Sequence, residues 1–222
     1  GKGFKFMCWD AEIMFGSLTA NILAENNPNC PSNIYQQLLK NSAFVRLMAN
    51  RIQKHCFNGG VLTPESIIAR WNTRKTFLEN PIMAEAARWG DYRRDVHPYQ
   101  TAGPFALYKK DTHWLTQQNF LINTYFPQRT TQFVTQLKTA GIFPTVDAPV
   151  YYLNNNSTHL SNVLVGDKLT MTAAQGTIYY TTNGSDPVDW ETGTVNTKIA
   201  KSYSGAITIA QSMWVASRAY YG

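Results

Sequence analysis

The chain has 222 residues, which is enough for one large domain or two small ones. Hydrophobic residues make up 44% of the sequence and charged residues only 15%, a composition that excludes a coiled coil and a long disordered tail. No apolar run approaches the roughly 20 residues that a membrane-spanning helix needs, so we expect no transmembrane segment.

The formal net charge of +6 is unevenly distributed along the chain. Residues 1–144 carry 16 Lys and Arg against 9 Asp and Glu, a difference of +7, whereas residues 145–222 carry 4 against 5, a difference of −1. This contrast indicates two domains with different partners. No run of basic residues is longer than two, and nucleic-acid-binding proteins usually show a denser basic stripe, so we expect no nucleic-acid partner.

The first two thirds of the chain are predicted to be mostly helical. A short aromatic-rich strand is expected at residues 4–9, and apolar residues then recur with the helical period. Ser32, Ser42 and Thr63 are the expected N-caps, and Pro64 suits the first helical position. Residues 90–111 are expected to form a loop because they are rich in Gly and Pro. The predicted helices span residues 33–40, 43–57, 64–79, 112–126 and 127–140, and a short turn is predicted at residues 81–88.

The pattern changes after Gly141, where a proline-containing linker precedes segments with a period of two. Such segments, separated by clusters of Asn, Gly and Ser, indicate a small antiparallel β-sandwich. The sequence therefore predicts an α+β protein with two domains, a mostly α-helical one at residues 1–144 and a β-sandwich at residues 148–222. The predicted strands span residues 150–153, 168–172, 177–182, 206–209 and 213–218.

The three cysteines, Cys8, Cys30 and Cys56, have no C-x-x-C spacing, which argues against a zinc site. Three cysteines form at most one disulfide bond and no disulfide scaffold. The simplest interpretation is three buried thiols.

The C-terminal part carries a motif that is specific to one family. Residues 176–187 read GTIYYTTNGSDP, which resembles the hairpin of the chitobiase/β-hexosaminidase C-terminal module, approximately G-x-I-Y-Y-T-x-D-G-S-x-P. Asn183 replaces the usual Asp, and both residues suit a tight turn. The resemblance covers residues 148–222. It implies an immunoglobulin-like accessory module without catalytic activity, found in secreted and cell-surface bacterial proteins, and therefore an extracellular or cell-surface location.

The N-terminal part resembles the C-terminal portion of the spore coat protein H (CotH) kinase-like family. The main signature is Trp9-Asp10-Ala11-Glu12 followed by Phe15-Gly16, and shorter matching stretches follow in order at residues 41–46, 57–60, 84–91 and 125–129. The resemblance covers residues 4–144. Because this family has an atypical protein kinase fold, the resemblance implies that the helical part is the C-terminal lobe of such a fold.

The CotH resemblance also implies a metal site in the full-length protein. Asp10 corresponds to the acid that holds Mg²⁺ with ATP, and Glu12 stands where the family has a second Asp. Side chains two residues apart on an extended segment point to the same side, so both carboxylates could share one cation. The nucleotide-covering loop and the Lys that a kinase needs are not found in these residues. We therefore expect neither cofactor binding nor phosphotransfer from this chain alone.

The alternative is a non-catalytic protein that attaches to a polysaccharide or a cell-surface protein through a degenerate kinase fold and the β-sandwich. Trp190, which follows Asp189 in a predicted loop, is the best candidate for an exposed ring that stacks on a ligand. Simple packing of Trp190 over the edge of the sandwich is slightly favoured.

A second cluster contains three charged residues in a region rich in tryptophan. Their helical spacing favours a buried salt-bridge network among core aromatic residues over a platform for substrate. The charged residues are Glu85, Arg88 and Asp91, and the tryptophans are Trp71, Trp89 and Trp114.

Overall fold

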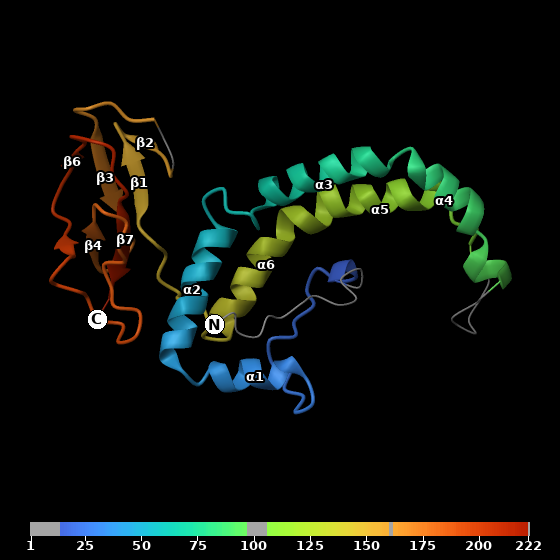
Figure 1. The fold of residues 1–222 in the computed structure, drawn as a ribbon, viewed down its shortest axis with the longest axis horizontal. Coiled ribbons are helices and arrows are strands. Elements are labelled where there is room, and N and C mark those ends of the chain that lie inside the picture. Colours follow the sequence, from blue (N-terminus) through green and yellow to red (C-terminus); the bar gives the residue numbers. More distant parts are fainter. Residues whose placement is uncertain (1–13, 97–105, 160–161, 222) are drawn as a thin grey trace, which may run out of the picture. The chain divides into compact units, whose positions relative to one another are not determined.

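The computed structural model describes residues 14–96, 106–159 and 162–221 (Figure 1). The predicted strand at residues 4–9 lies outside these ranges. Within them, helices come first along the chain and antiparallel strands follow, which confirms the predicted α+β class. Contacts group the chain into two compact units, one with the residues up to Asn21 and His55–Thr135, the other with Ile22–Lys54 and the residues from Gln136 onward.

Proline starts several of the helices. Pro31, Pro64 and Pro81 each stand in the first turn, where the missing N–H has no intrahelical partner to lose. The helices are α1 (Pro31–Leu38), α2 (Ser42–Cys56), α3 (Pro64–Leu78), α4 (Pro81–Trp89), α5 (Leu115–Phe120) and α6 (Phe126–Thr139), with π-helical segments η2 (Tyr92–Val96), η3 (Lys110–Trp114) and η4 (Leu121–Tyr125).

The N-cap predicted for the second helix is wrong by one residue. Ser42 is already the first residue of α2. The side-chain oxygen of Asn41 accepts hydrogen bonds from the backbone N–H groups of Ala43 and Phe44, at 2.8 and 3.2 Å. Asn is as good an N-cap as Ser, so the local sequence does not distinguish Asn41 from Ser42 as the N-cap of this helix.

The helix break predicted between residues 126 and 127 is also wrong, because η3, α5, η4 and α6 follow one another without a gap. Pro127 would normally collide with the carbonyl group four residues earlier. The preceding turn is a wider π-helical one, in which the Phe126 N–H bonds to the carbonyl oxygen of Leu121. This turn accommodates the proline and lets the helix continue. Residues 92–96, predicted as loop, form η2, and residues 81–88, predicted as a short turn, lie in the α-helix α4.

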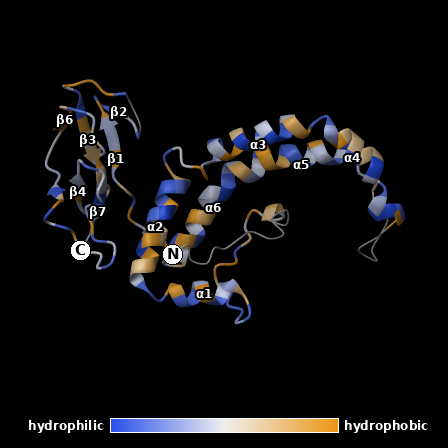
Figure 2. Ribbon diagram, viewed as in Figure 1, coloured by the Kyte–Doolittle hydropathy of each residue, from blue (hydrophilic) through white to orange (hydrophobic). Residues whose placement is uncertain are grey.

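The first unit has a small aromatic core between α3 and the stretch from η4 to α6. Leu121, Tyr125 and Phe126 are buried there, and the ring of Phe15 meets the ring of Trp71 edge to face, with centroids 5.4 Å apart. The indole N–H of Trp71 donates to the side-chain oxygen of Gln118 at 2.6 Å, which ties α3 to α5. Figure 2 shows hydrophobic and hydrophilic residues interspersed along α3.

The C-terminal part consists of two antiparallel sheets, with strand orders β2-β1-β3-β6 and β5-β4-β7. A hydrogen bond of 2.6 Å between the hydroxyl groups of Tyr151 and Ser217 joins the two sheets, and Leu169, Met171 and Ile178 are buried. The strands are β1 (Val150–Leu153), β2 (Asn156–Ser157), β3 (Lys168–Thr172), β4 (Thr177–Thr181), β5 (Lys201–Ser202), β6 (Ile207–Thr208) and β7 (Ala216–Tyr220). This confirms the predicted small antiparallel β domain.

None of the helices among the described residues has the length and apolar character needed to cross a membrane, in line with the expectation from the sequence.

Replacement of Gly176 by Ala tests the turn that leads into β4. Gly176 has a φ of +77°, and a Cβ atom there would lie 2.4 Å from the carbonyl oxygen of Tyr220. We expect Gly176→Ala to lower the free energy of unfolding of the β part by about 1–3 kcal/mol, measured by urea denaturation. Gly205→Ala is the control, since nothing lies within 4 Å of its Cβ position, and equal stability of the two variants would contradict this account.

Candidate binding site

The turn after β4 contains the Asn-Gly-Ser motif noted in the sequence. The side-chain oxygen of Asn183 accepts a hydrogen bond from the Ser185 N–H at 3.0 Å, and the hydroxyl group of Thr181 donates to the Ser185 carbonyl at 2.6 Å. Gly184 has a φ of +78°, which an L residue rarely adopts. A carboxylate oxygen of Asp would accept the same bond as the Asn183 amide, which explains why either residue suits this turn.

Asp186 and Arg218 form a bidentate ion pair that connects this turn to β7. The Nε and Nη2 atoms of Arg218 donate to the two carboxylate oxygens of Asp186 at 2.6 and 2.5 Å. The same carboxylate accepts a hydrogen bond from the Val188 N–H at 3.0 Å. Both side chains are about one-third exposed, with 34% and 35% of their surface accessible, so solvent screens the pair only in part.

Trp190 lies in a short loop that is closed by the side chain of Asp189. One carboxylate oxygen of Asp189 accepts hydrogen bonds from the N–H groups of Glu191 and Thr192, at 2.8 and 2.9 Å. The Gly193 N–H donates to the Asp189 carbonyl at 2.7 Å. These bonds fix the backbone on both sides of Trp190, while 47% of the Trp190 surface stays exposed.

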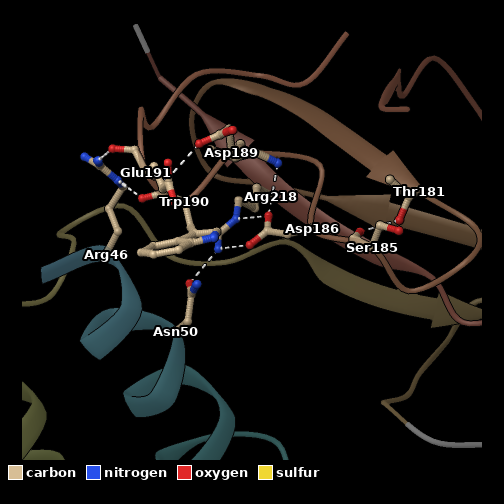
Figure 3. Close-up of polar contacts among 10 residues, drawn as sticks. Arg46, Asn50, Thr181, Ser185, Asp186, Asp189, Trp190, Glu191 and Arg218 are labelled. Carbon is tan, nitrogen blue, oxygen red and sulfur yellow. Dashed lines mark hydrogen bonds and ion pairs between the residues drawn. The ribbon is translucent and has the colours of Figure 1, made fainter. Parts of the chain in front are cut away.

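Two residues of α2 contact this loop region within the second compact unit (Figure 3). The Arg46 Nε donates to the carbonyl oxygen of Trp190 at 2.6 Å, and its Nη2 donates to the carbonyl oxygen of Glu191. One helical turn later, the side-chain oxygen of Asn50 accepts a hydrogen bond of 2.5 Å from Arg218. Residues four apart share one face of a helix, so α2 meets the β part with a single polar face.

Trp214 is a second exposed tryptophan of the β part. It is 77% exposed, and it forms a β-bridge with Asn183 just beyond the paired residues Thr181 and Ala216. The sequence analysis did not single it out, because it fell inside a predicted strand. Because side chains alternate between the two faces of a strand, Trp214 would be expected on the same face as Arg218 and on the opposite face from Val215 and Ser217.

The predicted charged cluster, of which Glu85 and Arg88 lie on α4, is not buried. Glu85 and Arg88 are exposed, and no ion pair joins them to each other or to Asp91 among the residues that the structure describes. The guanidinium group of Arg88 lies over the ring of its neighbour Trp89, 5.0 Å from the centroid. Trp71, by contrast, packs in the core of the first unit. The expected buried salt bridge among core aromatic residues is therefore not found.

In residues 14–96, 106–159 and 162–221, no three His, Cys, Asp or Glu side chains gather in a way that could hold a metal ion. Asp10 and Glu12 lie outside these ranges, so the Mg²⁺ and ATP site stays a prediction.

The prediction that the cysteines are buried thiols is wrong at one of the two cysteines that the structure describes. Cys56 is buried as a free thiol, whereas Cys30 is a free thiol exposed at the surface, where it precedes Pro31 at the start of α1. Cys8 lies outside the described residues.

Comparison with known proteins adds one finding. Residues 168–220, from β3 through β7, match the family described as Fn3 associated. No curated protein and no solved structure matches the chain. The match includes Asp186, Trp190, Trp214 and Arg218. It agrees with the prediction that the C-terminal part is a small immunoglobulin-like or fibronectin-like β module.

The loop around Trp190 should respond to pH only at strongly acidic values. Hydrogen bonds from the N–H groups of Thr192 and Glu191 lower the pKa of Asp189 from its ordinary value of 3.8. Their stabilising effect is complete above pH 3.8 and is lost as the pH falls through the lowered pKa. We expect the amide NMR signals of Glu191 and Thr192 to titrate with a midpoint below 3.8.

Asp189→Asn keeps an acceptor oxygen without a charge, so it should remove that titration. A midpoint at or above 3.8, or the same titration in Asp189→Asn, would contradict the assigned role of this carboxylate.

Proposed function

We propose that the β part of the chain is a carbohydrate-binding accessory module of the chitobiase C-terminal type, which holds a polysaccharide by stacking sugar rings on Trp190 and Trp214. The observation that supports this most is the presence of two exposed indoles in the β part, which are 47% and 77% accessible. Large exposed aromatic side chains often mark interaction sites. The apolar C–H faces of a sugar ring pack well against a flat indole, whose polar N–H stays in contact with water.

The charge of the β part favours a neutral, hydroxyl-rich ligand. Residues 145–222 carry 4 Lys and Arg against 5 Asp and Glu, so no excess of positive charge attracts polyanions. Beside Trp190, the exposed Glu191 and Thr192 offer acceptors and a donor for sugar hydroxyl groups. We therefore favour a neutral polysaccharide over nucleic acid or an anionic surface.

The setting we propose is a secreted or cell-surface bacterial protein of the CotH kinase-like family. The resemblance of residues 176–187 to an accessory module of secreted proteins supports an extracellular location. In this setting the module would attach the protein to cell-wall or environmental polysaccharide, or to a cell-surface protein that carries such chains.

A second candidate function is Mg²⁺- and ATP-dependent phosphorylation by the full-length protein. The observation that favours it is the Trp9-Asp10-Ala11-Glu12 motif ahead of a helical region. A kinase places carboxylates around Mg²⁺ to neutralise charge on the transferred phosphoryl group, and Asp10 and Glu12 would supply them.

Removal of either exposed indole should weaken polysaccharide binding. Stacking on an aromatic side chain contributes about 1–3 kcal/mol per base in nucleic-acid complexes, and we expect a similar effect here. Trp190→Ala and Trp214→Ala should each reduce affinity about 5- to 100-fold. The measurement is retention of the chain on insoluble chitin, cellulose and peptidoglycan, with depletion isotherms on whichever of them the wild type binds.

Trp89→Ala is the matched control, because Trp89 on α4 has the same 47% exposure as Trp190 but lies outside the β part. The proposal would be refuted if the wild type bound none of the three polymers. It would also be refuted if Trp89→Ala weakened binding as much as the other two substitutions.

The kinase candidate is tested with the full-length protein. Incubation with labelled ATP and Mg²⁺ or Mn²⁺ should transfer label to protein, and Asp10→Ala should abolish the transfer because the metal loses its main ligand. Absence of transfer, together with a melting temperature that ATP does not raise, would leave a non-catalytic scaffold.

A further inference from the structure

We propose that Arg46, on α2, is a positioning residue for Trp190, so that the binding module includes a helical segment from the N-terminal half of the chain. This inference rests on the proposed stacking role of Trp190. The region that resembles a chitobiase-type module begins at residue 148 and the Fn3-associated match at residue 168, so neither includes this helix.

The first observation is the geometry of the Arg46 side chain. Its planar guanidinium group donates to two successive backbone carbonyls, those of Trp190 and Glu191, across 144 and 145 residues of sequence. Arginine suits this task because its N–H groups form a rigid fork, whereas the lysine ammonium is a single point. The contact therefore fixes the orientation of the peptide unit that carries the Trp190 side chain.

The second observation is that the loop is shaped to receive the guanidinium group. Gly193 closes the loop with a φ of +79°, and a Cβ atom at this position would lie 3.1 Å from Nη1 and 3.3 Å from Cζ of Arg46. Glycine thus leaves space for the arginine at a backbone conformation that few other residues adopt. The Asp189 carboxylate adds an attractive charge on the same side of the loop.

The third observation is a second anchor on the same face of α2. Asn50 accepts a hydrogen bond from Arg218, whose guanidinium group is already held by Asp186. Loss of Arg46 therefore leaves α2 attached to the β part through Asn50. The freed carbonyls of Trp190 and Glu191 belong to exposed residues and can bond to water, so their loss of a partner has little effect on global stability.

The physical consequence is preorganisation of the indole. A ring that already has its bound orientation loses less conformational freedom when a sugar stacks on it. Without Arg46 the loop keeps its Asp189 bonds but gains motion around residues 190 and 191. Affinity for the polysaccharide should then fall while the fold stays intact.

The test compares Arg46→Gln with Arg51→Gln in the full chain. Arg51 lies on the same helix, and among the described residues its exposed side chain makes no hydrogen bond or ion pair, so the two variants remove the same charge. We expect Arg46→Gln to weaken binding to the polymer that retains the wild type by about five- to tenfold. Arg51→Gln should bind like wild type, and Arg46→Lys should lie between the two because it replaces the fork by one donor.

A readout without polysaccharide separates this inference from the proposed function. Backbone amide hydrogen exchange of residues 189–194 should be faster in Arg46→Gln than in Arg51→Gln, with melting temperatures that differ by no more than a few degrees. Faster exchange with unchanged binding, in a protein whose binding needs Trp190, would overturn the positioning role alone. Equal exchange in the two variants would also overturn it, whereas binding that does not need Trp190 would refute the proposed function and this inference together.

Discussion

The ion pair between Asp186 and Arg218 is the interaction on which the arrangement of the candidate site depends. Asp186 stands at the turn that precedes the Trp190 loop, and Arg218 stands in the middle of β7, so their two parallel hydrogen bonds fix the loop to the sheet. Arg218 also reaches Asn50 of α2. A single guanidinium group thus connects a turn, a strand and a helix, which explains why Arg218 is half-buried although it carries a charge.

The loop that follows shows how polar local structure can keep a large apolar ring at the surface. Trp190 would gain by turning into the core, yet its backbone is constrained by Asp189 on one side and by Gly193 on the other. The core of the β part is already filled by residues such as Leu169, Met171 and Ile178. An exposed ring on a constrained backbone has the character of a binding surface, where rigidity before binding contributes to affinity.

Much of this fold could be predicted from the sequence because its signals are local. Pro64 before Glu65 predicted the start of α3 correctly. The alternation of apolar and polar residues predicted β1 and β3 with the same bounds as in the structure. The strands β2 and β5 have two residues each, too few for a period of two to be visible.

The site was predicted only in part. Trp190 was found because a tryptophan after an acidic residue in a polar loop is a local signal. Trp214 was missed because its neighbours read as strand, and exposure depends on where a strand ends. The roles of Arg46 and Asn50 had no local signal at all, since their partners lie 144 and 168 residues away in sequence.

The central claim is that the two exposed indoles of the β part contact a polysaccharide. The most direct measurement is an NMR titration of the chain with ¹⁵N-labelled tryptophan, which gives one indole N–H signal for each of its six tryptophans. Soluble fragments of the polymer that retains the protein serve as the ligand. The account predicts that the signals of Trp190 and Trp214 move and that those of Trp71 and Trp89 do not. Movement confined to tryptophans of the helical part, or no movement at saturating ligand, would contradict it.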